Sequence, residues 1–246
     1  MVKLIRSVCI VQARLGSERF NRKVVKMILN KPLILLLLER LTLCKHLDDL
    51  VVAIPKKDKK LYNLLKYKFN VFKGKEHDVL SRYYYAALKY NADIIIRITG
   101  DCPLVDPEMV DKYIEKFKNS KFDYISNINP PTFPNGFDIE VFSFKVLKKV
   151  FKKATIKEDR EHVTRYIVKN KIFKKYNFKN SKDLSFLRLT VDYKEDFLLI
   201  TKIFVFFKKK KFLFKDIIQF YKSNKSLFLQ NLKYLRNEKL IKLDSK

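Results

Sequence analysis

The sequence predicts an α/β protein with a doubly wound, mostly parallel sheet and a small strand-and-loop insertion in its middle. Three observations support this class. Short apolar runs alternate with segments of helical length, several runs are apolar almost throughout, and the 246 residues suit one large domain. Continuous apolar runs are typical of strands buried on both faces of a parallel sheet. Ligands of such sheets bind beyond the carboxyl ends of the strands, so the loops there are the expected site.

The first half of the chain alternates strands and helices in strict order. Strands are expected at 7–13, 50–54, 71–72 and 93–98, and helices at 32–43, 59–67 and 78–90. The strand at 93–98 reads Asp-Ile-Ile-Ile-Arg-Ile and is expected to be central. Strand, helix and strand in this order imply right-handed crossovers.

The second half is less regular. Helices are expected at 107–119, 144–153, 161–170, 194–207 and 216–222, and strands at 123–126, 137–142 and 186–191. The loop at 129–136 holds three of the seven prolines, which interrupt regular structure. We predict one main domain over 1–207, an insertion near 127–142, and a helical C-terminal extension over 208–246 that packs on the domain.

The formal net charge is +28, from 54 Lys and Arg against 26 Asp and Glu. Such an excess suits a nucleic-acid partner, because Lys and Arg neutralise phosphates. Of these cations 43 are Lys, however, which a coding bias toward Lys, Asn, Ile and Phe explains without any polyanion. We expect no nucleic-acid partner.

The apolar segments and the cysteines indicate a cytoplasmic protein. The longest apolar run, at 33–38, is far shorter than the roughly 20 residues that span a bilayer, so no membrane insertion is expected. The apolar start of the chain is too short for a signal peptide. Cys9, Cys44 and Cys102 are irregularly spaced and form neither a disulfide framework nor a metal knuckle, which fits a reducing compartment.

The loop after the first predicted strand is rich in phosphate-binding groups. It offers the amides of Gly16 and Ser17, with cations at Arg14, Arg19, Arg22 and Lys23. Backbone donors and guanidinium forks are what a polyphosphate needs. The loop is neither a P-loop nor a dinucleotide-binding motif. A merely solvated basic loop is the alternative.

Two carboxylates follow predicted strands. Asp101 comes after the strand at 93–98, between Gly100 and Cys102, and is a candidate Mg²⁺ ligand, since Mg²⁺ is held by one or two carboxylates together with substrate phosphates. Asp192 follows the strand expected at 186–191. Asp101 can instead cap a turn or the next helix, and Asp192 can cap the next helix, a role that is compatible with metal binding. If the two strands are neighbours, the carboxylates can hold one metal from two sides.

Six ordered segments resemble one enzyme family. They are QARLGSERF, HDVLSRYYYAA, ADIIIRITGDCPLVDPE, FPNGFDIEVFS, EDREHVT and LSFLRLTVDYKEDF. Together they resemble the CMP-sugar synthetase (acylneuraminate cytidylyltransferase) family, most closely its spore coat polysaccharide biosynthesis type branch. The resemblance implies a nucleotide-diphospho-sugar transferase type fold and activation of an acidic sugar, of the nonulosonic acid type, with CTP. It further implies release of pyrophosphate, Mg²⁺ dependence, a homodimer and a role in surface polysaccharide biosynthesis.

The resemblance also implies roles for single residues. Nucleotide contacts are implied at Ala13, Arg14, Gly16, Ser17, Arg19, Lys23, Asp78, Ser81, Arg82 and Gly100. Catalytic roles are implied for Arg14, Lys23 and Asp101, and metal binding for Asp101 and Asp192. Contacts to the acceptor sugar are implied at Asn135, Gly136, Asp138, Glu140, Glu161 and His162, and the segment near 127–142 becomes the sugar-side and dimerisation insertion.

The sequence departs from the family pattern at two places, and two alternative functions stay open beside the resemblance. Asn21 and Arg22 stand where the family has Pro-Gly, and Tyr193 and Lys194 stand where it has Thr-Pro. One alternative is a related nucleotidyl or glycosyl transferase that uses another nucleotide or a non-sugar acceptor such as a phosphonate. The other is a non-enzymatic nucleic-acid-binding protein, which leaves the segments around Asp101 and Asp192 unexplained.

Overall fold

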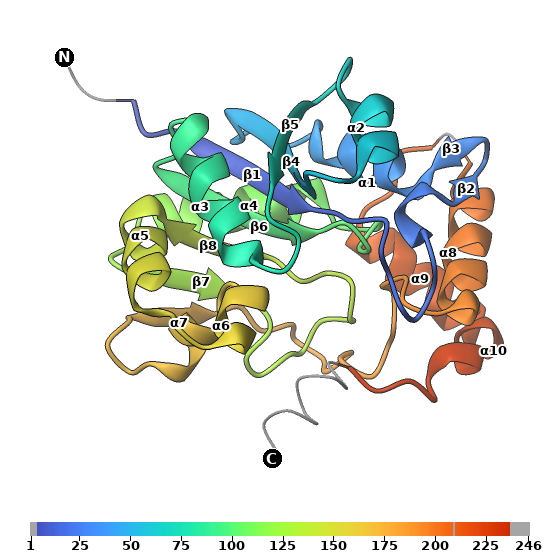
Figure 1. Cartoon of the computed structure of the whole chain (residues 1–246). Coiled ribbons are helices and arrows are strands. Elements are labelled where there is room, and N and C mark those ends of the chain that lie inside the picture. Colours follow the sequence, from blue (N-terminus) through green and yellow to red (C-terminus); the bar gives the residue numbers. More distant parts are fainter. Residues whose placement is uncertain (1–3, 209, 237–246) are drawn as a thin grey trace.

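The computed structural model describes residues 4–208 and 210–236. A seven-stranded sheet in the order β5-β4-β1-β6-β8-β7-β9 forms its centre (Figure 1). The strands are β1 (Ser7–Gln12), β4 (Asp49–Pro55), β5 (Asn70–Gly74), β6 (Ile94–Thr99), β7 (Tyr124–Ser126), β8 (Glu140–Ser143) and β9 (Lys175–Asn177). Pairing is parallel among β5, β4, β1 and β6, and β8 runs antiparallel to both β6 and β7. The predicted mostly parallel sheet is confirmed.

Helices cover both faces of this sheet. One face carries α1 (Leu33–Leu41), α2 (Lys59–Leu65) and α4 (Pro107–Lys118), and the other carries α3 (Val79–Lys89), α5 (Phe144–Lys153) and α7 (Arg165–Lys169). Because successive side chains of a strand point to opposite faces, Cys9 and Val11 of β1 join the first core, and Val8 and Ile10 join the second. The helices and strands predicted in the first half form with ends within two residues of expectation.

A third core lies beside the sheet. It joins α8 (Lys194–Phe207), α9 (Phe214–Ser223) and α10 (Lys225–Phe228) to the hairpin of β2 (Met27–Ile28) and β3 (Lys31–Pro32), which stand together at the right of Figure 1. Ile28 and Leu189 pack there with Ile203 and Phe220. The predicted extension thus shares its core with the main domain, although 209 and 237–246 lie outside the described residues.

The strand expected at 186–191 does not form. β8 occupies the place next to β6, so this segment runs irregularly across the ends of the sheet and makes a single isolated bridge, between Asn135 and Arg188. Its amides bond to loops instead: Leu189 N donates to Asn135 O at 2.6 Å, and Val191 N donates to Asp101 O at 2.8 Å. Its apolar residues face the third core, which explains a strand-like pattern without a strand.

The helix expected at 161–170 is also wrong as a single element. Two short helices, α6 (Lys157–Glu161) and α7, are separated at His162–Thr164, where Val163 adopts a left-handed φ of 53°. The expected strand at 137–142 begins only at Glu140. Sequence patterns also miss β9 and the β2–β3 hairpin, because strands of two or three partly polar residues carry no clear periodicity. Short 3₁₀ turns, η1 (Lys23–Val25) and η2 (Leu229–Asn231), complete the elements.

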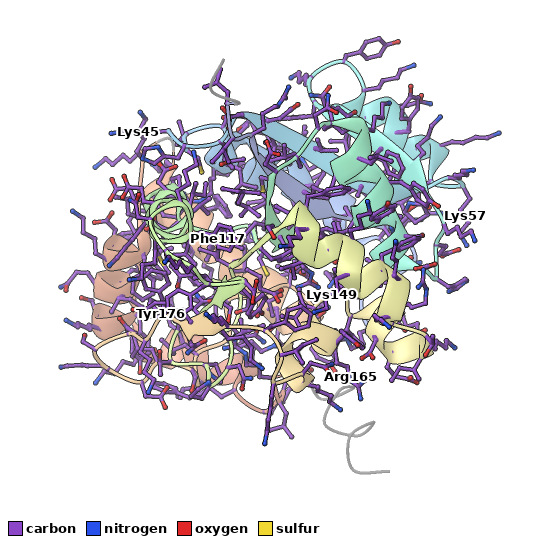
Figure 2. All side chains as sticks on the ribbon, turned by 90° about the vertical axis from the view of Figure 1, so that its left-hand side faces the viewer. Lys45, Lys57, Phe117, Lys149, Arg165 and Tyr176 are labelled. Carbon is purple, nitrogen blue, oxygen red and sulfur yellow. The ribbon has the colours of Figure 1, made fainter. Side chains whose placement is uncertain are left out.

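The surface is basic in many places. Nitrogen-tipped side chains project around the outline of the molecule in Figure 2, and the labelled Lys45, Lys57 and Lys149 come from three separate regions and are exposed. This spread matches the expectation that most lysines are solvated. In the described part of the chain, no helix has the length and apolar character needed to cross a membrane.

Candidate active site

A cavity of about 780 Å³ opens at the carboxyl ends of β1 and β6. In the sheet, β4 and β5 lie on one side of β1, and β6 lies on the other side. The loop after β1 leads toward β4, away from β6, so the loops after β1 and β6 diverge and leave a crevice between them. The two loops meet closely at their base, where Gly100 N donates to Gln12 O at 2.9 Å. A Cβ on Gly100 would lie 2.9 Å from that oxygen, so the close approach requires glycine.

Most of the predicted site residues line this one cavity. They are Ala13, Arg14, Ser17, Arg19, Lys23, Arg82, Gly100, Asp101, Asn135, Asp138, Glu140, Glu161, His162 and Asp192. They come from loops and helix ends far apart in the sequence. The site roles themselves stay predictions, and the geometry below shows what each group can do.

Lys23 joins the two predicted metal-binding carboxylates. Its ammonium lies 2.6 Å from Asp101 Oδ2 and 2.7 Å from Asp192 Oδ1, and it is buried. Asp101 Oδ1 accepts from Thr99 Oγ1 at 2.6 Å. Arg19 Nη2 lies 2.6 Å from the same Asp192 oxygen that Lys23 contacts. The two carboxylates therefore share one cation, at the place where the sequence predicts a metal.

The electrostatics of this group keep it charged. Burial favours the neutral forms, but the charge of Lys23 and hydrogen bonds from Lys23 and Thr99 outweigh it and hold the pKa of Asp101 below its ordinary value. Burial likewise opposes the Lys23 charge, yet Asp101 and Asp192 raise the pKa of that ammonium. Both groups are ionised at neutral pH.

Asp192 is held by a second buried network. Arg188 Nη2 donates to Asp192 Oδ2 at 2.9 Å, while Arg188 Nε donates to Asp196 Oδ1 at 2.9 Å. Asp196 Oδ2 accepts from the amides of Asp192 and Tyr193, both at 2.9 Å. The N-cap of α8 is Tyr193 and that of α4 is Asp106. The alternative in which Asp101 and Asp192 cap these helices is therefore wrong.

Arg14 and Arg82 lie together at the cavity wall. Burial lowers the pKa of the Arg82 guanidinium, and the positive charge of Arg14 adds to the effect. Arg82 is 2% exposed and donates to Glu76 O at 3.3 Å, and neither arginine forms an ion pair with a described residue. Two such cations facing one cavity favour a polyanionic ligand.

The opposite side of the cavity contains acids that are already paired. Arg97 Nη1 donates to Glu140 Oε2, and Tyr124 donates to Glu140 Oε1 at 2.6 Å. Arg236 Nη2 donates to Asp138 Oδ1 at 2.5 Å. Burial raises the pKa of Asp138 despite this partner. This wall offers oriented carboxylates to a hydroxyl-rich ligand.

The segment between α6 and α7 closes the same wall. Glu161, His162 and Thr164 line the cavity together with Arg165, which begins α7 and is labelled in Figure 2. Burial lowers the pKa of His162, so its imidazole is neutral at neutral pH. The left-handed turn at Val163 separates the two short helices here and faces their ends toward the cavity.

Four predicted residues lie outside the cavity lining. Asp78 accepts from Ser81 N at 3.0 Å as the N-cap of α3 and pairs with Arg160 at 2.7 Å, beside a second hollow of about 500 Å³. Gly16 is exposed. Gly136 has φ +108°, and a Cβ there would lie 2.4 Å from the Leu189 backbone, so its role is conformational.

Several functional neighbours are absent from the sequence-based site. Arg97, Arg188 and Arg236 each hold a cavity carboxylate, and Thr99 and Thr190 bond to Asp101 at 2.6 and 3.2 Å. The scarcity of arginine, with 11 in the chain, is the signal that points to the first two, since both lie within the segments of family resemblance. Arg236 begins a further segment of family resemblance, Arg-Asn-Glu at 236–238, but nothing local in the sequence assigns it a partner.

Comparisons with known proteins show which family this chain resembles. A family model described as cytidylyltransferase matches residues 8–241. The spore coat polysaccharide biosynthesis protein SpsF of Bacillus subtilis is 31% identical over 208 residues, which cover 79% of this chain and 85% of that protein. A cytidylyltransferase structure from Leptospira borgpetersenii superposes with a TM-score of 0.90 at 31% identity, over 95% of this chain and 100% of that one.

A more distant structure shares the fold. It is a CMP:2-keto-3-deoxy-manno-octonic acid synthetase complexed with CTP, with a TM-score of 0.66 at 16% identity, over 81% of this chain and 98% of that one. The nucleotide-diphospho-sugar transferase type fold expected from the sequence is confirmed. With the family match over most of its length, this chain belongs to the cytidylyltransferase family.

Proposed function

We propose that this protein transfers CMP from CTP to an acidic sugar of the nonulosonic acid type and releases pyrophosphate, supplying a CMP-sugar for surface polysaccharide biosynthesis. The observation that carries the proposal is the pair of carboxylates, Asp101 and Asp192, in one cavity with Arg14 and Arg82, which form no ion pair with a described residue. The spore coat polysaccharide name of the Bacillus relative supports the biosynthetic role. The sugar-acid synthetase that shares the fold supports an acidic acceptor.

The cavity fits two substrates of this kind. Its volume of about 780 Å³ lies within the usual range of small-molecule sites, about 300–1,000 Å³. The triphosphate of CTP binds against Arg14 and Arg82, where two positive charges lack paired carboxylates. The acceptor binds opposite, between Asn135, Asp138 and His162, which line the same cavity.

The chain also contains a donor set suited to Mg²⁺. Asp101 and Asp192 already converge on one cation, Lys23. No described group of three or more His, Cys, Asp or Glu side chains is arranged to bind a metal. A pair of carboxylates fits Mg²⁺ nevertheless, because this ion binds one or two carboxylates and completes its shell with phosphate oxygens and water. Bound there, Mg²⁺ supplies charge neutralisation for the phosphates.

The protein's own residues position and neutralise the reactants. A hydroxyl of the acceptor attacks the α-phosphorus in line, the bond to the β-phosphate oxygen breaks, and pyrophosphate leaves. Arg14 and Arg19 stabilise the charge on the leaving group, together with Lys23 once it is released from the carboxylates. Asp138 and Glu140 are already paired with arginines, whereas His162 is neutral and lines the same cavity, so we assign it the hydroxyl proton.

Pyrophosphate release tests the proposal. The wild-type protein is incubated with CTP, ATP, GTP or UTP and Mg²⁺, with a panel of 2-keto sugar acids and with a phosphonate. We expect turnover only with CTP and a sugar acid. Turnover with another nucleotide, or turnover in which the phosphonate and no sugar acid serves as acceptor, would instead support the alternative, a related nucleotidyl or glycosyl transferase.

A pair of variants tests the site. Asp101→Asn removes a charge that meets Lys23, and we expect its rate to fall by about 100-fold or more. Asp183→Asn is the matched control, because Asp183 is exposed and bonds only locally, to Ser185. Equal rates in both variants would contradict the role of Asp101. The homodimer and the cytoplasmic location stay predictions, which light scattering and cell fractionation check.

A further inference from the structure

The last described residues of the chain cross the outer wall of the active-site cavity. We call residues 231–236 the C-terminal strap. Asn231 Nδ2 donates to Arg188 O and to Asp196 Oδ1, both at 2.9 Å. Arg188 Nη1 in turn donates to Leu235 O at 3.4 Å. The strap is therefore bonded to the residues that hold Asp192.

Side chains fix the middle of the strap as well. The rings of Tyr234 and Tyr193 stack with centroids 3.7 Å apart and 7° between their planes. Lys233 Nζ lies 2.9 Å from Glu195 Oε1 at the first turn of α8. These contacts carry the strap from the start of α8 toward the 133–138 loop, and its final described residue arrives at the acceptor wall.

Arg236 holds that loop at two points. Its Nη1 donates to Phe133 O at 3.1 Å, and its Nη2 donates to Asp138 Oδ1 at 2.5 Å. The Arg236 side chain is 13% exposed, so the pair is largely screened from solvent. A guanidinium that bonds a carboxylate and a nearby carbonyl fixes orientation as well as charge.

The charge of Asp138 depends on its pairing with Arg236, because the other neighbouring groups oppose that charge. The acids Asp101 and Glu140 lie close enough to oppose its charge, and burial acts in the same direction. Asp101 is paired with Lys23 and Glu140 with Arg97, so neither cation is available to Asp138. Among the described residues, Arg236 is its ion-pair partner. Without Arg236, this partly buried carboxylate among acids would take up a proton or turn away from the cavity.

We propose that Arg236 is a positioning residue for the acceptor sugar, because it keeps the Asp138 carboxylate oriented into the cavity as a hydrogen-bond acceptor for the sugar's hydroxyls. This inference rests on the proposed function, since it assigns the Asp138 wall to the acceptor. It places Arg236, at the end of the C-terminal strap, in the acceptor site. Arg14 and Arg82, on the CTP side, have no described hydrogen bond or ion pair with Arg236.

Steady-state kinetics of pyrophosphate release test the proposal, with CTP and the sugar acid that wild type uses best. Arg236→Met removes the charge and keeps most of the volume, and Arg236→Lys restores the charge with fewer donors. Arg6→Met is the matched control, since it breaks an Arg–Asp pair, with Asp49 at 3.3 Å, at the amino end of β1 and away from the cavity. Asp138→Asn and the double variant complete the set.

We expect Arg236→Met to lower kcat/KM for the acceptor at least tenfold, with the KM for CTP within twofold of wild type. Arg236→Lys recovers part of the loss, and Arg6→Met changes neither constant. The double variant is no worse than Asp138→Asn, because the two residues act through one contact. We expect CTP, added without the sugar acid, to raise the Tm of every variant as it raises the Tm of wild type.

Two results overturn the proposal. If Arg236→Met and Arg6→Met have equal kcat/KM for the acceptor, the Arg236–Asp138 pair does not contribute to acceptor binding. If Arg236→Met loses kcat/KM equally for CTP and for the acceptor, the role of Arg236 is only structural. If Arg236→Met does not fold, the same comparison applies to Arg236→Lys. A wild-type protein that turns over CTP with no sugar acid overturns the proposed function itself, and the inference with it. That failure is seen in wild type, so it is distinct from a failure confined to the variants.

Discussion

Lys23→Met is the perturbation for which the structure gives the clearest magnitude. The change removes the ammonium between Asp101 and Asp192, 2.6 and 2.7 Å away, and keeps most of the side-chain volume. Removing one partner of a buried ion pair costs about 3–5 kcal/mol, because the charge left behind stays buried. Asp192 keeps Arg19 and Arg188, so Asp101 alone loses its cation, and we expect the lower end, about 3 kcal/mol.

The pH dependence of this loss follows from Asp101. Its pKa lies below the ordinary value of about 3.9, so its contribution to stability is present above that value and is lost as the pH falls through the folded-state pKa. In Lys23→Met the burial of Asp101 is no longer offset, and its pKa rises. The stability difference between wild type and variant is therefore full at neutral pH. It shrinks as the pH falls through the raised pKa of Asp101 in the variant and on toward its lowered pKa in wild type.

Thermal unfolding at pH 7 and at pH 3.5 measures this difference. In a chain of this size 1 kcal/mol shifts Tm by about 2–4 °C, so we expect Tm to fall by about 6–12 °C at pH 7. Lys31→Met is the control, because its ion pair with Glu39 is half exposed and is worth about 0–1 kcal/mol. A Tm like that of the control at pH 7, or a difference that does not narrow at low pH, would refute the reasoning.

Three further predictions follow from single contacts. Gly136→Ala should lower the free energy of unfolding by more than about 2 kcal/mol in urea titrations, because φ at Gly136 is +108° and an added Cβ would lie 2.4 Å from backbone atoms. Gly16→Ala is the control, because the atom nearest to its added Cβ is 3.7 Å away. We expect Gly16→Ala to change the free energy of unfolding by less than about 1 kcal/mol. Arg14→Met should raise the KM for CTP about tenfold or more while Tm stays unchanged, since Arg14 forms no ion pair with described residues but faces the cavity; an unchanged KM contradicts its phosphate role. Arg160→Met should lower Tm without altering the KM for CTP, because its partner Asp78 lies outside the cavity. A raised KM for CTP would contradict this and support the predicted nucleotide contact of Asp78.

Local patterns in the sequence were sufficient for the parallel half of the fold. The apolar runs at β1, β4 and β6 are buried on both faces, and such runs leave few structures other than a covered parallel sheet. The carboxyl ends of parallel strands lie at one edge of the sheet, so the basic loop after β1 and Asp101 after β6 could both be placed at that edge in advance. The position of β6 beside β1 is known only from the structure.

Hydrophobic periodicity predicted a strand wrongly where apolar side chains of an irregular segment are buried in a core outside the sheet. The segment 186–191 alternates like a strand because Leu187, Leu189 and Val191 face the third core, but β8 already fills the place beside β6. Asp192 still reaches Asp101, through the bond between Val191 N and Asp101 O at 2.8 Å. The predicted meeting of the two carboxylates is observed, although by a different route.

The sequence by itself determined the fold class, the family, and the edge of the sheet at which the candidate site lies, because these depend on short-range periodicity and on ordered motifs. Only the tertiary structure decided which charges meet. Lys23 lies between Asp101 and Asp192, and Arg236 reaches Asp138 across 98 positions of sequence. Pairings at such separations depend on how whole elements pack, and no local pattern of residues encodes them.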